Sequence, residues 1–451
     1  MKAYPEYSAT PLPWLRKMPS HWELARNKNV FQETKDVVGE NADAYPLLSL
    51  TTKGIILRDV ASGKGKFPKD FNTYKIVKEG DMAFCLFDID ETPRTVGLSG
   101  YDGMLTGAYS IFHVSNINSR YVYYYYLSLD NVKAMRPLYS GLRKTINTAT
   151  FLGTKLPIPP RTEQDQIVRF LDWKISMVNR LINTKHREIK AIDAMKRSVV
   201  SSAVTRGLNP NTPMKYSGVK WLGDIPAHWQ TVKLRRVLHP VSIKNHPELP
   251  LLSVVREQGV IIRDVTDKEA NHNYIPDDLS NYKMVKKGQF AMNKMKAWQG
   301  SYGISDYTGI VSPAYFIFDV SFDNLEYFHY AIRSKVYVNF FAQASDGIRV
   351  GQWDLQMDKM KEIPFIVPPA DEQIAIVDYI KRMLPKYDVA IEKLTEEVAV
   401  LEEYKAKLIS DVVTGKVDAR DIQIPEYELV DEEIDTNVEN DEESETEEQE
   451  D

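Results

Sequence analysis

Two long stretches of the chain, residues 161–208 and 370–417, carry mostly apolar side chains at alternating steps of four and three residues. A 3.5-residue spacing kept over ten positions is typical of a left-handed coiled coil. About 40 residues at 1.5 Å each predict helices on the order of 60 Å long. The first seam comprises Leu171, Ile175, Val178, Ile182, Lys185, Ile189, Ile192, Lys196, Val199 and Ala203, and the second comprises Ile380, Leu384, Tyr387, Ile391, Leu394, Val398, Leu401, Lys405, Leu408 and Val412.

The region before each stretch has a different pattern. Short β-branched and aromatic runs such as YPLLSL, GIILRDV and DMAFCLF alternate with Gly and Asp, which is typical of strands joined by turns. A double proline ends each region, and Thr162 or Asp371 is expected to cap the helix that follows. Glu163 and Glu372 fall in the first helical turn, where negative charge is favoured. Pro385 is expected to kink the second helix.

The chain repeats itself at an offset of about 207 residues. The matched segments are WLRKMPSHW (14–22) with WLGDIPAHW (221–229), GIILRDV (54–60) with GVIIRDV (259–265), YKIVKEGDMAF (74–84) with YKMVKKGQFAM (282–292), and LPIPPRTEQ (156–164) with FIVPPADEQ (365–373). We therefore expect two copies of one unit, each a mixed domain followed by a long helix.

The apolar seams of the two matched helices can pack against each other within one chain. The expected fold class is α+β, with two mixed α/β domains in tandem pseudo-repeat, separated by two long helices that form an antiparallel intramolecular coiled coil. This pairing would hold the mixed domains at a fixed separation about an approximate two-fold axis. The expected segments are a first domain at 1–160, a helix at 161–208, a linker at 209–220, a second domain at 221–369, a second helix at 370–417 and an acidic disordered tail at 418–451.

Charge is distributed unevenly along the chain. The formal net charge is −6, but residues 426–451 contain 15 Asp or Glu and no Lys or Arg, which leaves +9 on the remainder. A basic body favours a polyanionic partner. The acidic tail has little to bury and is expected to be disordered. It would serve solubility, or it would compete with a polyanion for the basic body.

Several classes of protein are disfavoured by what the sequence lacks. Cys85 is the only cysteine, so neither an intrachain disulfide nor a thiolate zinc cluster is expected. There is no GxxxxGK[ST] phosphate-binding loop and no NPPY-type segment for a target adenine. Pro276-Asp277 has no Asp/Glu-x-Lys within the next 30 residues to complete a nuclease metal site. No apolar run reaches the roughly 18 residues of a membrane span, and residues 1–10 do not look like a signal peptide. A cytoplasmic, non-catalytic protein without a membrane partner is expected.

The ordered set of motifs resembles a known family. WLxxxPxHW, a variable region, PPxxEQ and a long heptad helix ending in VT, all given twice, are similar to the specificity subunits of type I restriction-modification systems. The resemblance implies that the mixed domains are target-recognition domains, each reading one half of a split DNA site. Residues 85–100 differ from 292–306 except at Gly97 and Gly303, so different bases are expected at the two ends.

The same resemblance implies the partners and cofactors. The long helices would act as a spacer and dock two methyltransferase subunits, which this chain would direct to double-stranded DNA for adenine methylation. S-adenosylmethionine, ATP and Mg²⁺ are expected on partner subunits, with no cofactor on this chain. A restriction and translocase subunit would join the complex where the system has one.

Cations in the variable regions are the candidates for DNA contact, because such side chains make most phosphate contacts and can also read guanine. They are Lys64, Lys66, Arg94, Arg143 and Lys144 in the first copy, and Lys294, Lys296 and Arg349 in the second. Trp298 and Gln299 are added, since Trp can insert at a groove and Gln can pair with adenine. The alternatives are solvated surface charges and a buried Trp.

Other residues have a plainer interpretation. The aromatic runs YVYYYYL (121–127) and LEYFHYA (325–331) are expected to be helix core rather than base-stacking platforms. His21 and His228 each stand beside a Trp without neighbouring metal ligands, so a structural role is expected. The competing hypothesis for the whole chain is a coiled-coil scaffold that assembles other subunits without reading DNA, and a stand-alone enzyme is least expected.

Overall fold

The computed structural model describes residues 2–58, 70–139, 144–264, 275–276, 278–349 and 352–433, the side chains of residues 348, 349 and 352 excepted. The chain divides into two compact units. Among the described residues, the first combines residues 2–187 with 395–433, and the second is formed by Glu188–Leu394. Both units mix helices and antiparallel strands, as the α+β prediction requires.

The first unit is built on a four-stranded antiparallel sheet. Its strands stand in the order β4 (Phe31–Thr34), β11 (Ser110–Val114), β8 (Met82–Phe84) and β9 (Val96–Leu98). The two-stranded pairs are β1 (Tyr7–Leu12) with β2 (Leu15–Pro19), β3 (Glu23–Arg26) with β12 (Lys155–Ile158), β5 (Leu48–Thr51) with β6 (Gly54–Leu57), and β7 (Lys75–Val77) with β10 (Gly103–Leu105). Helices α1 (Ser119–Asn131) and α2 (Thr148–Gly153) complete the mixed region.

The second unit has the same sheet order, strand for strand. Its sheet runs β16 (Leu238–Val241), β23 (Phe316–Val320), β20 (Phe290–Met292) and β21 (Tyr302–Ile304). The pairs are β13 (Met214–Tyr216) with β14 (Asp224–Pro226), β15 (Gln230–Lys233) with β26 (Pro364–Val367), β17 (Leu252–Val255) with β18 (Gly259–Ile262), and β19 (Lys283–Val285) with β22 (Gly309–Val311). A further hairpin, β24 (Ser345–Arg349) with β25 (Gln352–Leu355), and helices α4 (Leu325–Ile332), α5 (Lys335–Gln343) and α6 (Met357–Lys361) belong to this unit.

Small cores under the sheets match between the units. Leu48, Ile55, Val77, Ala83, Leu105 and Ile111 form one in the first unit, and Leu252, Val260, Val285, Ala291, Val311 and Ile317 occupy the corresponding places in the second. The apolar pattern of the two copies therefore buries the same strand faces in each.

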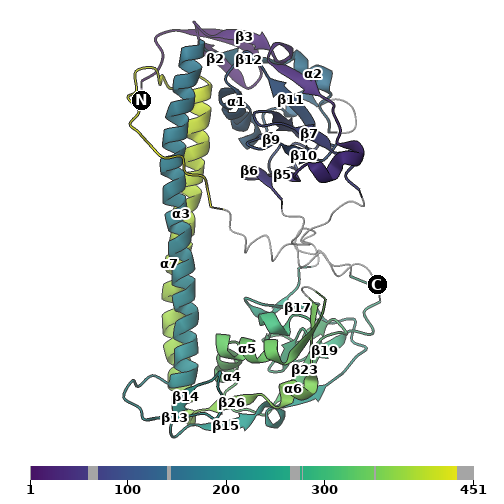
Figure 1. Cartoon of the computed structure of the whole chain (residues 1–451). Coiled ribbons are helices and arrows are strands. Elements are labelled where there is room, and N and C mark those ends of the chain that lie inside the picture. The colour runs from purple at the N-terminus through teal and green to yellow at the C-terminus, as the bar shows by residue number, and fades with distance from the viewer. Residues whose placement is uncertain are drawn as a thin grey trace. The chain divides into compact units, whose positions relative to one another are not determined.

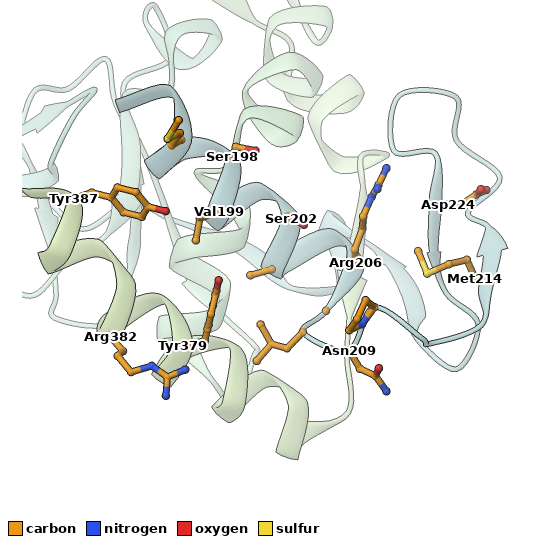
Figure 2. A pocket seen from close by; sticks show the side chains of 15 residues that line it. Ser198, Val199, Ser202, Arg206, Asn209, Met214, Asp224, Tyr379, Arg382 and Tyr387 are labelled. Carbon is orange, nitrogen blue, oxygen red and sulfur yellow. The ribbon is translucent and has the colours of Figure 1, made fainter. Parts of the chain in front are cut away.

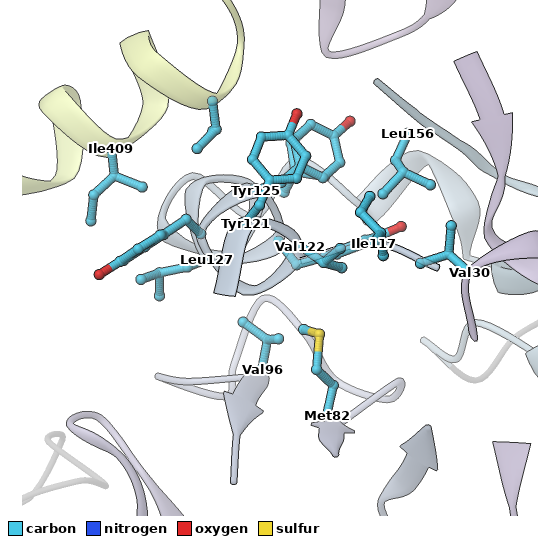
Figure 3. Close-up of a cluster of buried hydrophobic side chains, with 14 of the residues drawn as sticks. Val30, Met82, Val96, Ile117, Tyr121, Val122, Tyr125, Leu127, Leu156 and Ile409 are labelled. Atoms are coloured by element: carbon cyan, nitrogen blue, oxygen red, sulfur yellow. The ribbon is translucent and has the colours of Figure 1, made fainter. Parts of the chain in front are cut away.

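The main core of the first unit surrounds α1. Tyr121, Tyr125 and Tyr126 are fully buried, and the side chains of this helix meet Met82 and Val96 of the sheet on one side and Ile409 on the other (Figure 3). Figure 1 shows α1 between the sheet and the long helices of its unit. The aromatic run is core, as predicted, because a helix enclosed on two sides buries most of its circumference.

The long helices are α3 (Arg161–Arg206) and α7 (Ala370–Val413). In the first unit, Val178 and Ile182 pack against Val398. Lys185 lies 2.9 Å from Glu397, whereas Asn179 lies 3.4 Å from Lys405, so the chain directions oppose.

The two long helices also pack together in the second unit. There Ala203 and Val204 pack in the same core as Ile376 and Ile380. Helix–helix packing along the predicted seam is therefore present within each unit.

The ends of the long helices differ from expectation. Because α3 begins at Arg161 and α7 at Ala370, Thr162 and Asp371 lie inside the helices, and the prediction that they cap them is wrong. Helix α7 continues through Pro385, and the kink expected there stays a prediction.

The C-terminal segment, defined as residues 418–433, corrects the prediction of a disordered tail from residue 418. Gln166 Nε2 donates to the carbonyls of Ala419 (3.1 Å) and Ile422 (2.8 Å). Further along α3, Asn179 Nδ2 donates to the Val430 carbonyl at 2.9 Å. Ala419 is fully buried. Residues 418–433 are therefore bound to the first unit, because α3 supplies donors to their backbone.

Candidate nucleic-acid interface

The repeated sequence motifs meet at one carboxylate in each unit, which is buried in the first unit and partly exposed in the second. Glu163 is 4% exposed and accepts hydrogen bonds from Tyr4 Oη (2.6 Å), Trp22 Nε1 (3.0 Å) and His21 Nε2 (2.8 Å). Burial and the bond to Glu163 raise the pKa of Tyr4, which keeps its hydroxyl a donor. The WLxxxPxHW motif therefore supplies donors to the glutamate of the PPxxEQ motif, and together they anchor the long helix to the mixed domain.

The second unit repeats this anchor. Glu372 accepts from Trp229 Nε1 at 3.0 Å and contacts His228 Nε2. Both histidines are held by a carboxylate, which confirms the structural role predicted for them. Sequence reasoning assigned the two glutamates only to the helix dipole and missed this function. The signal was available, because both motifs recur together in both copies.

In the first unit, two candidate cations at the loop between β8 and β9 are in ion pairs. Arg94 Nη1 lies 3.1 Å from Oδ2 of the buried Asp130, and its side chain is 19% exposed. Its Nε also donates to the Thr52 carbonyl at 3.3 Å. Arg94 therefore fixes the base of the loop, because moving it onto DNA would leave a buried carboxylate short of a partner.

Lys144 lies beside the same loop. Its Nζ is 3.3 Å from Asp90 Oδ2 and also contacts Glu91, and both carboxylates raise the pKa of its ammonium group. The hydroxyl of Tyr139 donates to Asp90 at 2.7 Å and lowers the pKa of that carboxyl group. This edge of the first unit therefore presents the carboxylates of Asp90 and Glu91 beside Lys144, whose side chain is 47% exposed.

The corresponding loop of the second unit, between β20 and β21, is basic. Lys294 lies 3.0 Å from Asp354, while Lys296 and Gln299 are partly exposed at either end of the turn 297–299. Trp298 stacks on Trp353 of β25 with 5.5 Å between ring centroids, and its Nε1 is buried without a hydrogen-bond partner among the described residues. The Trp pair supports the turn that carries the two polar side chains.

Lys283, which was not among the residues predicted to contact DNA, lies near this loop. Lys283 Nζ donates to the Tyr315 carbonyl at 2.7 Å, and Lys75 makes the matching bond to the Tyr109 carbonyl at 2.6 Å in the first unit. Burial lowers the pKa of Lys283, and the positive charges of Lys244 and Lys294 lower it further. Crowded cations of this kind favour an anion, because the anion relieves their repulsion. The repeated YK motif was the available signal.

Four candidates cannot be placed by their side chains. Lys64, Lys66 and Arg143 lie outside the described residues. The backbone of Arg349 ends β24 opposite Gln352, at the tip of the hairpin that carries Trp353. The remaining candidates fall into two groups. Arg94 lies on the β8–β9 loop with Lys144 beside it, and the others lie on the β20–β21 loop.

Within the described ranges, no cluster of three or more His, Cys, Asp or Glu side chains is arranged to hold a metal ion. Among the helices that the structure describes, none is both long and apolar enough to span a bilayer.

Comparison with known proteins gives consistent results. The sequence model of the family described as "Type I restriction modification DNA specificity domain" matches residues 62–191. A protein of Methanocaldococcus jannaschii assigned as the type I restriction enzyme MjaX specificity subunit is 24% identical over 437 residues, which is 91% of this chain and 95% of that protein. The MjaVIII specificity subunit of the same organism is 24% identical over 451 residues, covering 94% of this chain and 99% of the relative.

A solved structure shares the fold. A chain from "Structural basis underlying complex assembly and conformational transition of the type I R-M system" has a TM-score of 0.55 and 13% identity, and the match covers 89% of this chain and 99% of that one. With a specificity-domain match at residues 62–191 and relatives aligned almost from end to end, the chain is similar to type I restriction enzyme specificity subunits along most of its length.

Proposed function

We propose that this protein reads a bipartite, asymmetric DNA site with two target-recognition domains and directs adenine methylation by partner subunits. The observation that carries the proposal is that both units have the same order of strands in their sheets but different loops between those strands. The β8–β9 edge carries Asp90 and Glu91 beside Lys144, whereas the β20–β21 edge carries Lys294 and Lys296 beside a Trp pair. Equivalent scaffolds with unlike surfaces suit two unlike half-sites.

The long helices form the spacer in this proposal. Antiparallel packing in the first unit, and packing of the same two helices in the second, support an intramolecular coiled coil between the two recognition domains. The helices would also dock two methyltransferase subunits, and a restriction and translocase subunit where the system has one. As a specificity subunit, the chain leaves catalysis to those partners, which would carry S-adenosylmethionine, ATP and Mg²⁺. Because its partner in this proposal is DNA, we propose that it acts in the cytoplasm.

Footprinting tests this proposal. The chain, assembled with its methyltransferase partner, is incubated with a library of random duplex DNA, and bound fragments are selected and probed for protection. We expect two short protected sequences separated by an unread gap of constant length. A coiled-coil scaffold would instead give weak, uniform protection without a consensus. Turnover of DNA by the purified chain alone would contradict its assignment as non-catalytic.

A further inference from the structure

The hairpins β5–β6 and β17–β18 keep the same strands in the two units but differ in their turns. Their strands bury apolar side chains in the two small cores that match between the units. The first hairpin turns through residues 52–53, and the second turns through residues 256–258. Every residue of both turns is exposed. The tips therefore diverge in length and in sequence on a base that both units share.

A glycine in each unit lets the hairpin lie close against the sheet. The variable regions of the two copies have little in common, but each keeps a glycine, Gly97 of β9 and Gly303 of β21. A Cβ atom on Gly97 would lie 2.6 Å from Leu50 and 2.7 Å from Ile55 of the hairpin. On Gly303 it would lie 3.4 Å from the Cα atom of Gly259. A side chain at either position would push against the hairpin, so both copies keep the residue on which it rests.

An arginine holds the turn in both units, but it comes from different elements. In the first unit, Nε of Arg94 on the β8–β9 loop donates to the Thr52 carbonyl at 3.3 Å. In the second unit, Nη2 of Arg333, the residue after α4, donates to the carbonyls of Arg256 and Glu257, each at 2.8 Å. Thr52 and Glu257 have the same place in the repeat, two residues before the glycine that begins the next strand. The same carbonyl is therefore fixed twice by unrelated side chains.

Arg333 also joins the turn to the end of the variable loop. Its Nη1 donates to the carbonyl of Tyr302, the first residue of β21. Beside it, the Ile304 backbone amide donates to His329 Nδ1 at 3.2 Å. Burial lowers the pKa of His329 to about 4, so its ring is neutral next to the guanidinium group. The turn and the β20–β21 loop therefore lie at the same end of β21 and are tied to each other.

The shape and chemistry of the tips suit base recognition. A two-stranded β-ribbon fits the major groove of duplex DNA. The second tip offers Arg256, Glu257 and Gln258, whose side chains match guanine, cytosine and adenine respectively. Arg256 lies 3.4 Å from Glu257, and their side chains are 44% and 75% exposed. An ion pair this exposed costs little to exchange for contacts with bases. The first tip offers Thr52 and Lys53 instead.

We propose that the two turns are base-reading tips that share the DNA surface with the variable loops, and that Arg333 is a positioning residue for the second tip. The proposal rests on the function proposed above and names residues that distinguish the two half-sites. A turn of two residues and a turn of three present different side chains to the groove, so the tips add to the asymmetry of the DNA site.

Selection from random duplex DNA tests the second tip, because in the first unit Lys53 Nζ already donates to the Glu433 carbonyl at 2.5 Å. The full chain carrying Arg256→Ala, Glu257→Ala and Gln258→Ala is assembled with the methyltransferase partner and compared with the unaltered chain. We expect discrimination to fall about tenfold or more at one or more positions of one half-site, with the other half-site and the gap retained. An unchanged consensus, or an affinity loss without a change in base preference, would overturn the proposal.

Two control variants change other surfaces of the same unit. Asp306→Ala with Tyr307→Ala alters the exposed turn at the opposite end of β21. Arg382→Ala removes one arginine from α7. Figure 2 shows Arg382 at the open groove between α3 and α7, which no residue of the β17–β18 turn lines. Both controls should return the original consensus. The same change of consensus in a control would contradict a reading role specific to the turn.

Arg333→Gln tests the positioning role, because it leaves the side chains of the tip in place. We expect base preference to relax at the same positions that the tip variant affects, and Arg333→Lys to restore part of it, since lysine keeps the charge but not the planar fork. Thermal unfolding of each variant checks the fold. If Arg333→Gln lowers affinity on all sequences alike, Arg333 does not position a reader. If it unfolds the unit, the exposed tip variant alone decides the proposal.

The unaltered chain separates this inference from the function on which it rests. Absence of any bipartite consensus with the unaltered chain would reject the function. A bipartite consensus that the tip variant leaves unchanged would reject only the reading role of the turn.

Discussion

At the scale of single residues, buried carboxylates organise the protein. Glu163 accepts three side-chain donors, and Asp130 holds Arg94 together with the Thr95 backbone amide at 3.0 Å. A buried carboxylate is favourable only when its oxygens are satisfied, so each of these groups ties segments that are distant in the sequence. Some cations that the sequence suggests are available for DNA, such as Arg94, are instead paired with these carboxylates.

We expect Glu163→Gln to destabilise the first unit by about 1–3 kcal/mol, because one carboxamide oxygen cannot satisfy three donors. Urea unfolding of the full chain measures the change. Glu40→Gln, at an exposed position, makes the same change in charge and is the control. An equal shift of the unfolding midpoint in the two variants would show that Glu163 is not an anchor.

A residue-scale prediction for binding concerns the cluster near Lys283. Lys244→Met should weaken DNA binding by a similar factor on every sequence and reduce the slope of log affinity against log salt by about 1, because it removes one phosphate contact. Fluorescence anisotropy over a range of salt concentrations measures both. Lys335→Met, on α5, serves as the control. A loss confined to one DNA sequence would identify Lys244 as a base reader instead.

At the scale of elements, the C-terminal segment lies against the long helices of the first unit. Lys405 lies 2.7 Å from Glu432, and Arg187 contacts Glu433. The acidic residues therefore neutralise basic side chains of α3 and α7 in the first unit. This contact is compatible with the hypothesis that the tail competes with a polyanion, and that hypothesis stays a prediction.

Truncation after residue 417 should destabilise the first unit by on the order of 3 kcal/mol, because it removes the backbone hydrogen bonds made by α3 and exposes the core under Ile422 and Ile424. Truncation after residue 433 is the control and should leave the free energy of unfolding nearly unchanged. Thermal or urea unfolding compares the two chains. Similar stabilities would mean that residues 418–433 contribute no net packing energy.

At the scale of the whole molecule, the proposed spacer makes a geometric prediction. Seven residues inserted in α3 after residue 187 and in α7 after residue 394 keep the heptad seam in register. They lengthen each helix by about 10 Å, which corresponds to roughly three base pairs of DNA. Selection from random DNA should return unchanged half-sites and a longer gap. Altered half-site sequences, or an unchanged gap, would reject the helices as the spacer.

The sequence by itself determined what depends on local periodicity and repetition. Heptad spacing predicted two helices, β-branched runs predicted short strands, and motifs repeated at a constant offset predicted two copies of one unit. These signals are readable because neighbouring residues decide them. The buried role of the Tyr121–Leu127 run was also readable, since its aromatic content exceeds what a solvated helix needs.

Only the tertiary structure decided which distant groups meet. Arg94 is tied to Asp130, Glu163 is an anchor rather than a simple dipole partner, and residues 418–433 lie on α3. Residues separated by tens to hundreds of positions make these contacts, and burial sets their energies, so no local pattern encodes them.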